Sequence, residues 1–505
     1  MRCQVRRFGA GDWRWIEGQA VLPVLTGGYG KRIPHAMKIR IIPLVVATAL
    51  FMENMDSTIL ATALPTIARD LGVDPISLKL AITSYLVGLA VFIPISSWVA
   101  DRLGARTTFR WALVVFLVAS IGCAYSSSLA GFVVWRFVQG VGGAMMTPVG
   151  RMMIVRSVPK SELVSALATL TIPALLGPMM GPLIGGAIVT YTDWRWIFLV
   201  NVPIGVIGII MATVYFDDVR PPPTPLDVRG FILCAIALLG LILGATALGR
   251  HVAPDWAVAL AFGVGAIAGA AYVRHARRVA HPLLDLRLFA LPTFDAGISG
   301  GSLFRIGIGA SAFLLPLMLQ LGFGLDALTS GMLTFASAIG ALSMKVAGGA
   351  ILKAFGFRRV LVVNAALAVG SLAALGLFTA ATPHLAIVAV VLVGGMFRSL
   401  QFSSMHALSY ADIGPKDAGA ATSISSVAQQ VSLSMGVAIG ALALELSQAF
   451  HRHATPQAGD FSIAIFVVAA IASTSIIYMV RLPADAGHEL MGAPPRKLPG
   501  DGVDP

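Results

Sequence analysis

The sequence predicts an all-α integral membrane protein with about fourteen transmembrane helices. Two features carry this prediction. The 505 residues are 57% hydrophobic and only 12% charged, whereas soluble domains carry about 25% charged residues. Apolar segments long enough to cross a bilayer, which takes roughly 20 residues, also follow one another with short breaks. We place them at 41–63, 78–99, 111–128, 130–155, 163–190, 196–216, 230–249, 255–274, 294–315, 327–349, 360–380, 385–409, 419–446 and 461–481.

Basic residues in the loops predict the orientation of these helices. Positively charged loops stay in the cytoplasm, and Lys and Arg gather in alternate loops of this chain. The basic loops hold Arg102, Arg106, Arg110, Arg156, Lys160, Arg220, Arg229, Arg274, Arg277, Arg278, Arg287, Lys353, Arg358, Arg359 and Lys416, and the others hold little beyond Arg69, Arg195, Arg250 and Arg452. With an even number of helices, both termini are expected on the cytoplasmic side of the membrane. The net charge of +12 therefore reflects topology and predicts no nucleic-acid partner.

Two unusual loops divide the helices into groups of six, two and six. The first contains Pro221-Pro-Pro-Thr-Pro225, a stiff linker. The second, 274–292, is the longest basic loop. The expected units are a disordered extension at 1–36, a six-helix bundle at 37–216, a linker with two inserted helices at 217–290, a second six-helix bundle at 291–482 and a disordered cytoplasmic tail at 483–505. Residues 1–36 could instead precede the natural start, since Met37-Lys-Ile-Arg40 would suit one.

The two bundles carry the same loop pattern at equivalent positions. Ser97-xxx-Asp101-xx-Gly104-x-Arg106 follows the second helix, and Gly349-xxx-Lys353-xx-Gly356-x-Arg358 follows the tenth. The spacings agree step for step in a cytoplasmic loop of each half. This agreement predicts pseudo-symmetric halves, and internal repeats are how many transporters are built.

Asp56 and Arg136 are opposite charges inside predicted membrane helices. Counted at about 1.5 Å per residue, both lie roughly 9–12 Å below the outer surface. Two opposite charges at one depth can neutralise each other, which an apolar setting demands. A carboxylate that alternates between an arginine and a proton would couple transport to protons. The alternative is a permanent ion pair that only joins two helices.

Glu53 lies one helical turn before Asp56. Two neighbouring carboxylates raise each other's proton affinity, so one of them could be protonated at neutral pH. Glu53 could serve as a second proton site or attract a cationic substrate. The alternative is a protonated acid that is hydrogen-bonded inside the bundle.

Two glycine-containing motifs predict close helix packing beside these charges. The run Arg136-Phe-Val-Gln139-Gly140-Val-Gly-Gly143 places Arg136 and Gln139 on one face with two glycines. The run Gly177-Pro-Met-Met-Gly181-Pro182-Leu-Ile-Gly185-Gly186 makes a flat groove with helix-weakening prolines. Ordinary packing explains both motifs equally well, and such packing would also be how a carrier closes. We assign Gln139 to the substrate cavity.

Charged residues near helix ends suggest a latch. The turn Asp101-Arg102-Leu-Gly104-Ala-Arg106 is expected to hold neighbouring helix ends in one conformation, although headgroup anchoring would also account for its arginines. Lys345 and Glu445 also lie near helix ends, where we expect their side chains to snorkel towards water.

The second half contains two arginines near mid-membrane. Arg305 and Arg398 could face the central cavity, with His406 two turns after Arg398, or they could pair with backbone carbonyls. The nineteen methionines would suit an adaptable apolar pocket, although packing is their more frequent role.

Motifs for enzymatic chemistry are missing from the sequence. It contains no phosphate-binding loop, HExxH, nucleophile elbow or paired CxxC, so we predict neither an enzyme nor a cofactor or metal. Cys3, Cys123 and Cys234 are too far apart to form a metal or redox motif. Without an ATP site, uphill transport must draw on an ion gradient.

These motifs together resemble the major facilitator superfamily, in its fourteen-helix drug:proton antiporter branch (the QacA/EmrB type). The resemblance covers roughly residues 40–480 and includes MdtD-like exporters. It rests on Asp56-Ser-Thr-Ile with the following Leu64-Pro65, Asp101-Arg-Leu-Gly104-Ala-Arg106, Arg136-xx-Gln139-Gly140, Gly142 to Arg151, Gly177-xxx-Gly181-Pro182-xx-Gly185-Gly186 and Trp194 to Pro203. The chain departs from the family at Ser97, where glycine is usual, at Ala61, where asparagine is frequent, and at Glu53, an extra acid.

The resemblance implies a carrier that alternates between two openings and lets protons in to drive an amphipathic compound out. Asp56 would be the proton site, Arg136 its switching partner and Glu53 a cation or second proton site. We expect a monomer in the lipid bilayer of a bacterial plasma (inner) membrane, with a periplasmic adaptor as a candidate partner. Two rivals remain open: an exporter of one dedicated metabolite, such as an anion held by Arg305 and Arg398, and a membrane sensor or scaffold that transports nothing.

Overall fold

The computed structural model describes residues 35–157, 176–177, 180–216, 225–247, 254–279, 282–413, 417–453, 455–483 and 486–487. Every element in these ranges is helical. Thirteen of the helical stretches are long and apolar enough to cross a membrane, and a shorter apolar helix, Met180–Tyr191, takes the place of a fourteenth. The rest of that predicted segment, and nearly all of the expected terminal extensions, lie outside the described residues. The predicted all-helical membrane fold is confirmed.

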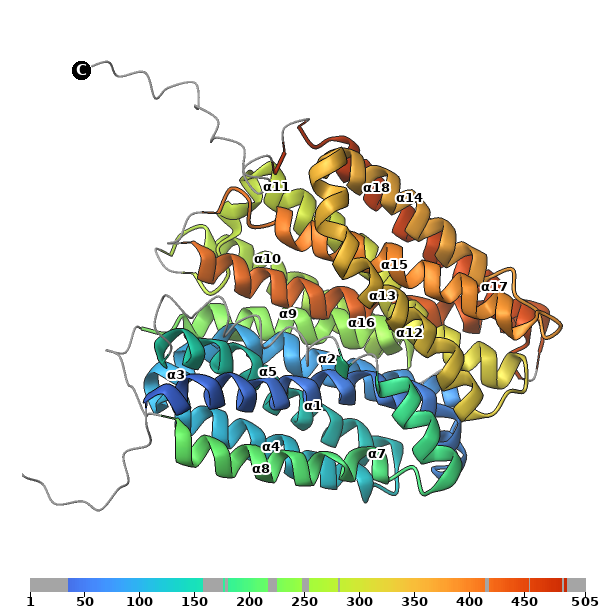
Figure 1. Cartoon of the computed structure of the whole chain (residues 1–505), viewed down its shortest axis with the longest axis horizontal. Helices are drawn as coiled ribbons and strands as arrows, with labels where there is room; N and C mark the ends of the chain where they lie inside the picture. Colours follow the sequence, from blue (N-terminus) through green and yellow to red (C-terminus); the bar gives the residue numbers. More distant parts are fainter. Residues whose placement is uncertain are drawn as a thin grey trace, which may run out of the picture.

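The described helices of the first bundle are followed along the chain by two further helices. The bundle consists of α1 (His35–Asp70), η1 (Pro75–Leu78), α2 (Lys79–Phe92), η2 (Ile93–Ile95), α3 (Ser96–Leu103), α4 (Ala105–Ala124), α5 (Leu129–Ser157), the Met180–Tyr191 helix, α7 (Trp196–Leu199) and α8 (Asn201–Tyr215). The inserted helices are α9 (Val228–Ala247) and α10 (Asp255–Ala276). Figure 1 shows the long helices of the bundle packed side by side, with α9 next to them.

The second bundle repeats this plan with two π-helical segments. It consists of η3 (Leu286–Ala290), α11 (Pro292–Asp295), η4 (Ala296–Gly300), α12 (Gly301–Leu317), η5 (Met318–Gly322), α13 (Ala327–Phe355), α14 (Phe357–Leu375), α15 (His384–Leu408), α16 (Ala418–His451), α17 (Ala458–Ser473) and α18 (Ser475–Val480). The segments η4 and η5 are the π-helices, one at each end of α12. The contacts of α13 with α15 correspond to those of α2 with α5 in the first bundle.

The two bundles touch along a central seam. Helix α1 contacts α12, and α2 contacts α16. One apolar core includes Ile59 of α1, Phe313 of α12 and Leu444 of α16, so burial of apolar surface holds both bundles together. We call the end of the molecule where α1 finishes and α2 begins the Asp70 end, and the opposite end the Arg102 end.

The inserted pair packs on both bundles. Helix α9 contacts α10, and it also contacts α2 and α16 across the seam. Gly240 lets the backbones of α9 and α10 come close, since a Cβ at this position would lie 2.5 Å from the carbonyl oxygen of Ala261. Before α9, Asp227 accepts hydrogen bonds from His275 at 2.7 Å and from the amide of Gly230 at 2.8 Å. Burial alone would raise the pKa of Asp227, but these hydrogen bonds outweigh it and hold the pKa below its ordinary value.

Candidate functional site

A buried ion pair lies at the centre of the first bundle. The Nη1 atom of Arg136 on α5 is 2.6 Å from the Oδ2 atom of Asp56 on α1. The exposed fraction is 0% for Asp56 and 1% for Arg136. The two side chains that the sequence placed at one depth are therefore in direct contact, away from water.

Amide and hydroxyl groups complete this ion pair. Gln139 accepts a hydrogen bond from Nη1 of Arg136 at 2.6 Å and donates one to Oδ1 of Asp56 at 2.9 Å. Asn201, the first residue of α8, donates to the same Oδ1 at 3.0 Å. Ser120 of α4 accepts from Gln139 at 2.8 Å. Four helices thus converge on one carboxylate, and each of its oxygens has a partner, as a buried charge requires.

Aromatic rings enclose the guanidinium of Arg136. Its central carbon lies 4.4 Å from the ring centroid of Tyr85 on α2 and 5.8 Å from that of Phe198 on α7. Helices α2 and α5 can approach this closely because Gly88 and Gly140 face each other. The motif containing Gln139 and Gly140 therefore positions the ion pair. Gln139 itself is fully buried in this cluster, so the structure places it beside Asp56 and not in the cavity to which we assigned it.

Glu53 lies one turn from Asp56 and is also tied to α5. The hydroxyl of Thr147 donates a hydrogen bond to Oε2 of Glu53 at 2.6 Å. Tyr85 lies near enough to both acids for an electrostatic interaction. Asp56 and Glu53 of α1 therefore both bind to α5, the first through a cation and the second through a neutral hydroxyl.

A cavity of about 310 Å³ lies between the two bundles. Its wall is formed by Ser57, Thr58, Ala61, Ile82, Pro182, Ser311, Ala312, Phe313, Leu315, Pro316, Thr334, Ser337, Ala338, Ala341, Leu342, Arg398 and Val437. Both halves of the chain contribute, and the wall is mostly apolar. Pockets for small molecules have this character and start near this volume, about 300 Å³.

Arg398 of α15 is the charged residue of the cavity wall. Its guanidinium donates to the hydroxyl of Ser311 at 2.9 Å and to the hydroxyl of Ser337. Arg305 of α12 lies outside the cavity wall and is 2% exposed. Its guanidinium faces the ring of Phe402 at 5.5 Å. Within the described residues, Nε and Nη1 of Arg305 have no hydrogen-bond partner.

The glycine motif of the Met180–Tyr191 helix packs on both bundles. A Cβ at Gly177 would lie 2.8 Å from the carbonyl oxygen of Phe51, and Cβ atoms at Gly181 and Gly185 would meet Thr58 and Thr62 of the same α1. A Cβ at Gly186 would instead lie 2.6 Å from the carbonyl oxygen of Ala327, in the second bundle. Pro182 packs beside Gly331 of α13 and also lines the cavity.

The two loop motifs that repeat between the halves adopt the same geometry. Gly104 joins α3 to α4 with φ 93°, and Gly356 joins α13 to α14 with φ 76°. Side chains other than glycine rarely adopt such angles. Arg106 donates to the carbonyl oxygen of Phe216 at 3.5 Å, and Arg358 donates to that of Val480 at 2.9 Å. Each arginine thus reaches the end of the last helix of its own bundle.

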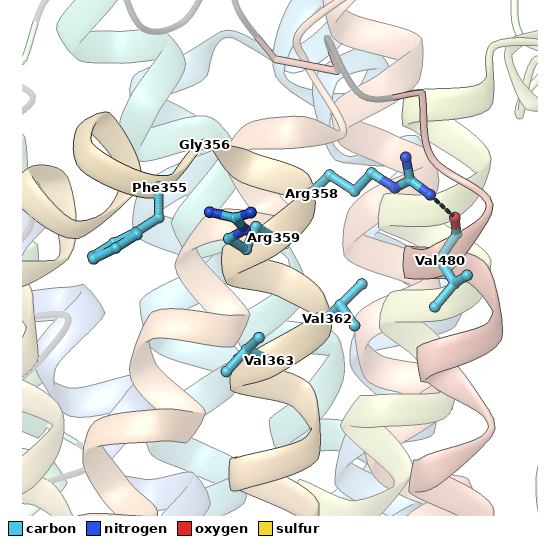
Figure 2. Close-up of a pocket in the computed structure, with 7 residues that line it drawn as sticks. All are labelled: Phe355, Gly356, Arg358, Arg359, Val362, Val363 and Val480. Atoms are coloured by element: carbon cyan, nitrogen blue, oxygen red, sulfur yellow. Dashed lines mark hydrogen bonds between the residues drawn. The ribbon is translucent and has the colours of Figure 1, made fainter.

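Other residues of these motifs lie at the surface. Asp101 is half-buried and Arg102 is exposed. Figure 2 shows Arg358 reaching across to Val480 while Arg359 lies on the other side of α14. Arg358, Arg359 and Val480 border a groove of about 530 Å³ at the Arg102 end. This groove lies away from the charged residues inside the bundles.

A second buried ion pair joins the two bundles at the Asp70 end. Nζ of Lys79 on α2 is 2.7 Å from Oε1 of Glu445 on α16. Lys79 is 0% and Glu445 6% exposed, so our expectation that Glu445 snorkels to water was wrong. The pair was missed because the two residues are 366 positions apart. The usable signal was two opposite charges at helix ends that are predicted on the same side of the membrane.

Comparisons with known proteins agree with this architecture. The model of the Major Facilitator Superfamily matches residues 46–437. A protein named "Putative multidrug resistance protein MdtD" from Klebsiella pneumoniae subsp. pneumoniae is 36% identical over 447 residues, which is 88% of this chain and 94% of that protein. Its namesake from Salmonella paratyphi B is 35% identical over 450 residues, which is 88% of this chain and 96% of that protein.

Solved structures resemble the fold at lower sequence identity. An auto-inhibited POT family peptide transporter matches with a TM-score of 0.64 and 17% identity, over 92% of this chain and 99% of that one. A D-xylose-proton symporter matches with a TM-score of 0.61 and 15% identity, over 89% of this chain and 99% of that one. At these identities the likeness establishes the fold alone.

Proposed function

The chain belongs to the Major Facilitator Superfamily, and we propose that it exports amphipathic compounds from the cell in exchange for protons. It is a membrane transporter and not an enzyme. The names of its relatives support drug or toxic-compound efflux. The single observation that carries proton coupling is the enclosed Asp56–Arg136 pair with its shared partner Gln139.

Protonation of Asp56 would change how α1 is held. The ionised carboxylate ties α1 to α5 through Arg136. A proton on Oδ2 removes the negative charge, and Arg136 then retains the carbonyl oxygens of Gln139 and Ala81. Because the next residues of α1, Ser57 and Thr58, line the cavity, a looser α1 changes the cavity wall. This connection supports our proposal that Asp56 is the proton site and Arg136 its switching partner.

Glu53 would act as a second proton or cation site. Among the described residues, the side chain of Glu53 accepts a hydrogen bond from a neutral donor, Thr147, and forms no ion pair as close as that of Asp56 with Arg136, so loss of its charge should disturb α1 less. Glu53→Gln is therefore expected to alter the number of protons per cycle or the preferred substrate charge, and not to abolish transport.

The bundles 37–216 and 291–482 would move as two units about the cavity. In one arrangement Lys79–Glu445 holds the Asp70 end closed. The latch residues Asp101, Arg102, Gly104 and Arg106 would stabilise one arrangement at the Arg102 end. With cytoplasmic termini, the Asp70 end faces outwards. We propose that a monomer completes this cycle, with or without a periplasmic adaptor.

The test uses inside-out vesicles with an imposed proton gradient and a pH-sensitive dye. Lipophilic cations, neutral compounds and anions are added to wild type, to Asp56→Asn and to Asp255→Asn. Asp255 is exposed at the start of α10, so its variant is the matched control. Proton release driven by substrates, lost only in Asp56→Asn, is the expected result. Unchanged release in Asp56→Asn would remove the mechanism.

Export of a single dedicated metabolite is the second candidate. The modest cavity and its one arginine, Arg398, favour it. Growth with a broad panel of toxic compounds separates the two, since overexpression of a multidrug exporter raises resistance to several of them. A sensor or scaffold that transports nothing is excluded once purified protein in liposomes moves any solute.

A further inference from the structure

The cavity presents a cation to a ligand without presenting an anion. A guanidinium has five N–H groups, and the hydroxyls of Ser311 and Ser337 engage two of those on Arg398. Hydroxyls are neutral acceptors, so the charge of Arg398 is left uncompensated. Neither Glu53 nor Asp56 belongs to the cavity wall.

No acid of the second bundle is placed to compensate this charge. The acids between 292 and 481 are Asp295, Asp326, Asp412, Asp417, Glu445 and Asp460, and none of them belongs to the cavity wall. Within the described residues, neither Arg305 nor Arg398 forms an ion pair with any carboxylate; the stretch 158–175, which is not described, contains one acidic residue, Glu162, before the predicted helix at 163–190. The imbalance is therefore a property of this region of the chain and not of one side-chain rotamer.

Arg305 adds a second buried cation beside the first. Phe402, whose ring it faces, lies one helical turn after Arg398 on α15. Arg305, Arg151 and Lys345 all act electrostatically on His406, one turn further along. The cations therefore continue along this face of α15 from the cavity towards the Arg102 end. A buried charge without a partner is costly, and an incoming anion would relieve that cost.

The rest of the cavity wall suits an apolar group. Ile82, Phe313, Leu315, Leu342 and Val437 come from both bundles. A ligand with an anionic head and an apolar body would satisfy the whole wall, whereas a lipophilic cation would have to approach Arg398 against like charge.

We infer that the transported compound is an amphipathic organic anion, whose carboxylate or similar oxyanion group binds Arg398 between Ser311 and Ser337. Arg305 is a positioning residue that makes the approach from the Arg102 end electropositive. The inference rests on the proposed function in one respect, namely that this cavity is the transport site.

Equilibrium binding with three probes of one shape tests this inference. The probes are 1-naphthylacetate, 1-naphthylacetamide and 1-naphthylmethylammonium, and the full chain is held in nanodiscs of neutral phosphatidylcholine. Hydrogen bonds to a charged group change affinity by roughly 10- to 100-fold. We expect the wild type to bind the carboxylate at least about tenfold more tightly than the amide or the ammonium.

Variants assign this preference to one side chain. Arg398→Gln should lose the roughly 10- to 100-fold preference for the carboxylate while amide binding is retained, and Arg398→Lys should keep part of it. Arg277→Gln removes an exposed arginine at the end of α10 and should change nothing. Retained amide binding shows that a variant is folded, and the ranking of the probes on wild type tests the inference even if Arg398→Gln cannot be purified.

Failure of this inference differs from failure of proton coupling. Carboxylate binding that is absent, weaker than ammonium binding, or unchanged in Arg398→Gln would overturn the anion site and leave the role of Asp56 intact. Selective carboxylate binding combined with unchanged proton release in Asp56→Asn would support the anion site and overturn only the coupling mechanism.

Discussion

Arg136 and Arg305 are almost equally buried, at 1% and 2% exposure, yet their surroundings are opposite. Arg136 bonds to Asp56, Gln139 and the carbonyl oxygen of Ala81. Arg305 faces an aromatic ring and leaves two nitrogen atoms without a partner among the described residues. A buried charge that has an ion-pair partner within the protein can act as a switch, because only a change in that partner, such as its protonation, disturbs it. A charge that the protein leaves unsatisfied can serve a ligand.

This contrast separates the two bundles by task. The first bundle pairs its deepest charges internally, and we propose that it carries the proton. The second bundle contributes Arg398 to the cavity wall, and we propose that it carries the substrate anion. Ser57, the residue after Asp56 on α1, lines the cavity together with residues of α12 and α15. The proposed proton site and the proposed anion site therefore border the same cavity.

Breaking the satisfied pair should produce the largest loss of stability. Asp56→Asn keeps the shape of the side chain but leaves the charge of Arg136 buried without a counter-ion, which costs about 3–5 kcal/mol. Thermal unfolding of the purified protein in one detergent measures this loss. Asp255→Asn is the surface control. A double variant, Asp56→Asn with Arg136→Gln, should recover part of the loss, and an unchanged melting temperature in Asp56→Asn would show that the pair is not desolvated.

Breaking the pair between the bundles should cost less and act differently. Lys79→Met leaves Glu445 without its 2.7 Å partner. The bundles can part and let water reach Glu445, so the loss should stay below the 3–5 kcal/mol of a pair that cannot hydrate. Spin labels at Asp193 and Gly459, both exposed on different bundles, should report longer distances. Addition of Glu445→Leu should restore the short distances, and distances that do not respond would refute this gate.

The sequence predicts the depth of the buried charges in the membrane, but it does not predict which side chains surround them. Depth in a helix can be counted at about 1.5 Å per residue, and this count predicts that Asp56 and Arg136 lie at the same depth. The rotation of each helix in the bundle cannot be counted in this way, so Asn201 was missed and Gln139 was assigned to the cavity. The positive φ of Gly104 and Gly356 was foreseeable, because a glycine at the same place in two tight turns implies it.

Glycine substitutions distinguish packing within a bundle from packing between bundles. Their expected effects on stability are smaller than those of the charge substitutions. Gly181→Ala would drive a Cβ into the hydroxyl of Thr58, and Gly186→Ala would drive one into the carbonyl of Ala327. Overpacking costs about 1–3 kcal/mol. Gly181→Ala should lower the melting temperature and be rescued by Thr58→Ala. Gly186→Ala should instead part the bundles and lengthen the distance between labels at Asp193 and Gly459.

Gly263→Ala is the matched control for these glycines. Among the described residues, no neighbouring atom lies within 4 Å of a Cβ at this position of α10, so alanine should be neutral or stabilising by up to about 1 kcal/mol. A melting temperature lowered as much by Gly263→Ala as by Gly181→Ala would mean that helix composition, and not close packing, governs the result.

Removing the unsatisfied arginine should have the smallest effect on stability and is the sharpest test of the contrast. Arg305→Met fills a similar volume and leaves no carboxylate unpaired, because Arg305 has no acidic partner among the described residues. It forfeits only the contact with Phe402, worth about 0.5–2 kcal/mol, and it gains the desolvation energy that a buried charge costs. The melting temperature should therefore stay equal or rise, while the affinity for 1-naphthylacetate falls. A loss of about 3–5 kcal/mol, as for Asp56→Asn, would instead mean that Arg305 has a structural counter-ion, and the division of tasks between the bundles would then fail.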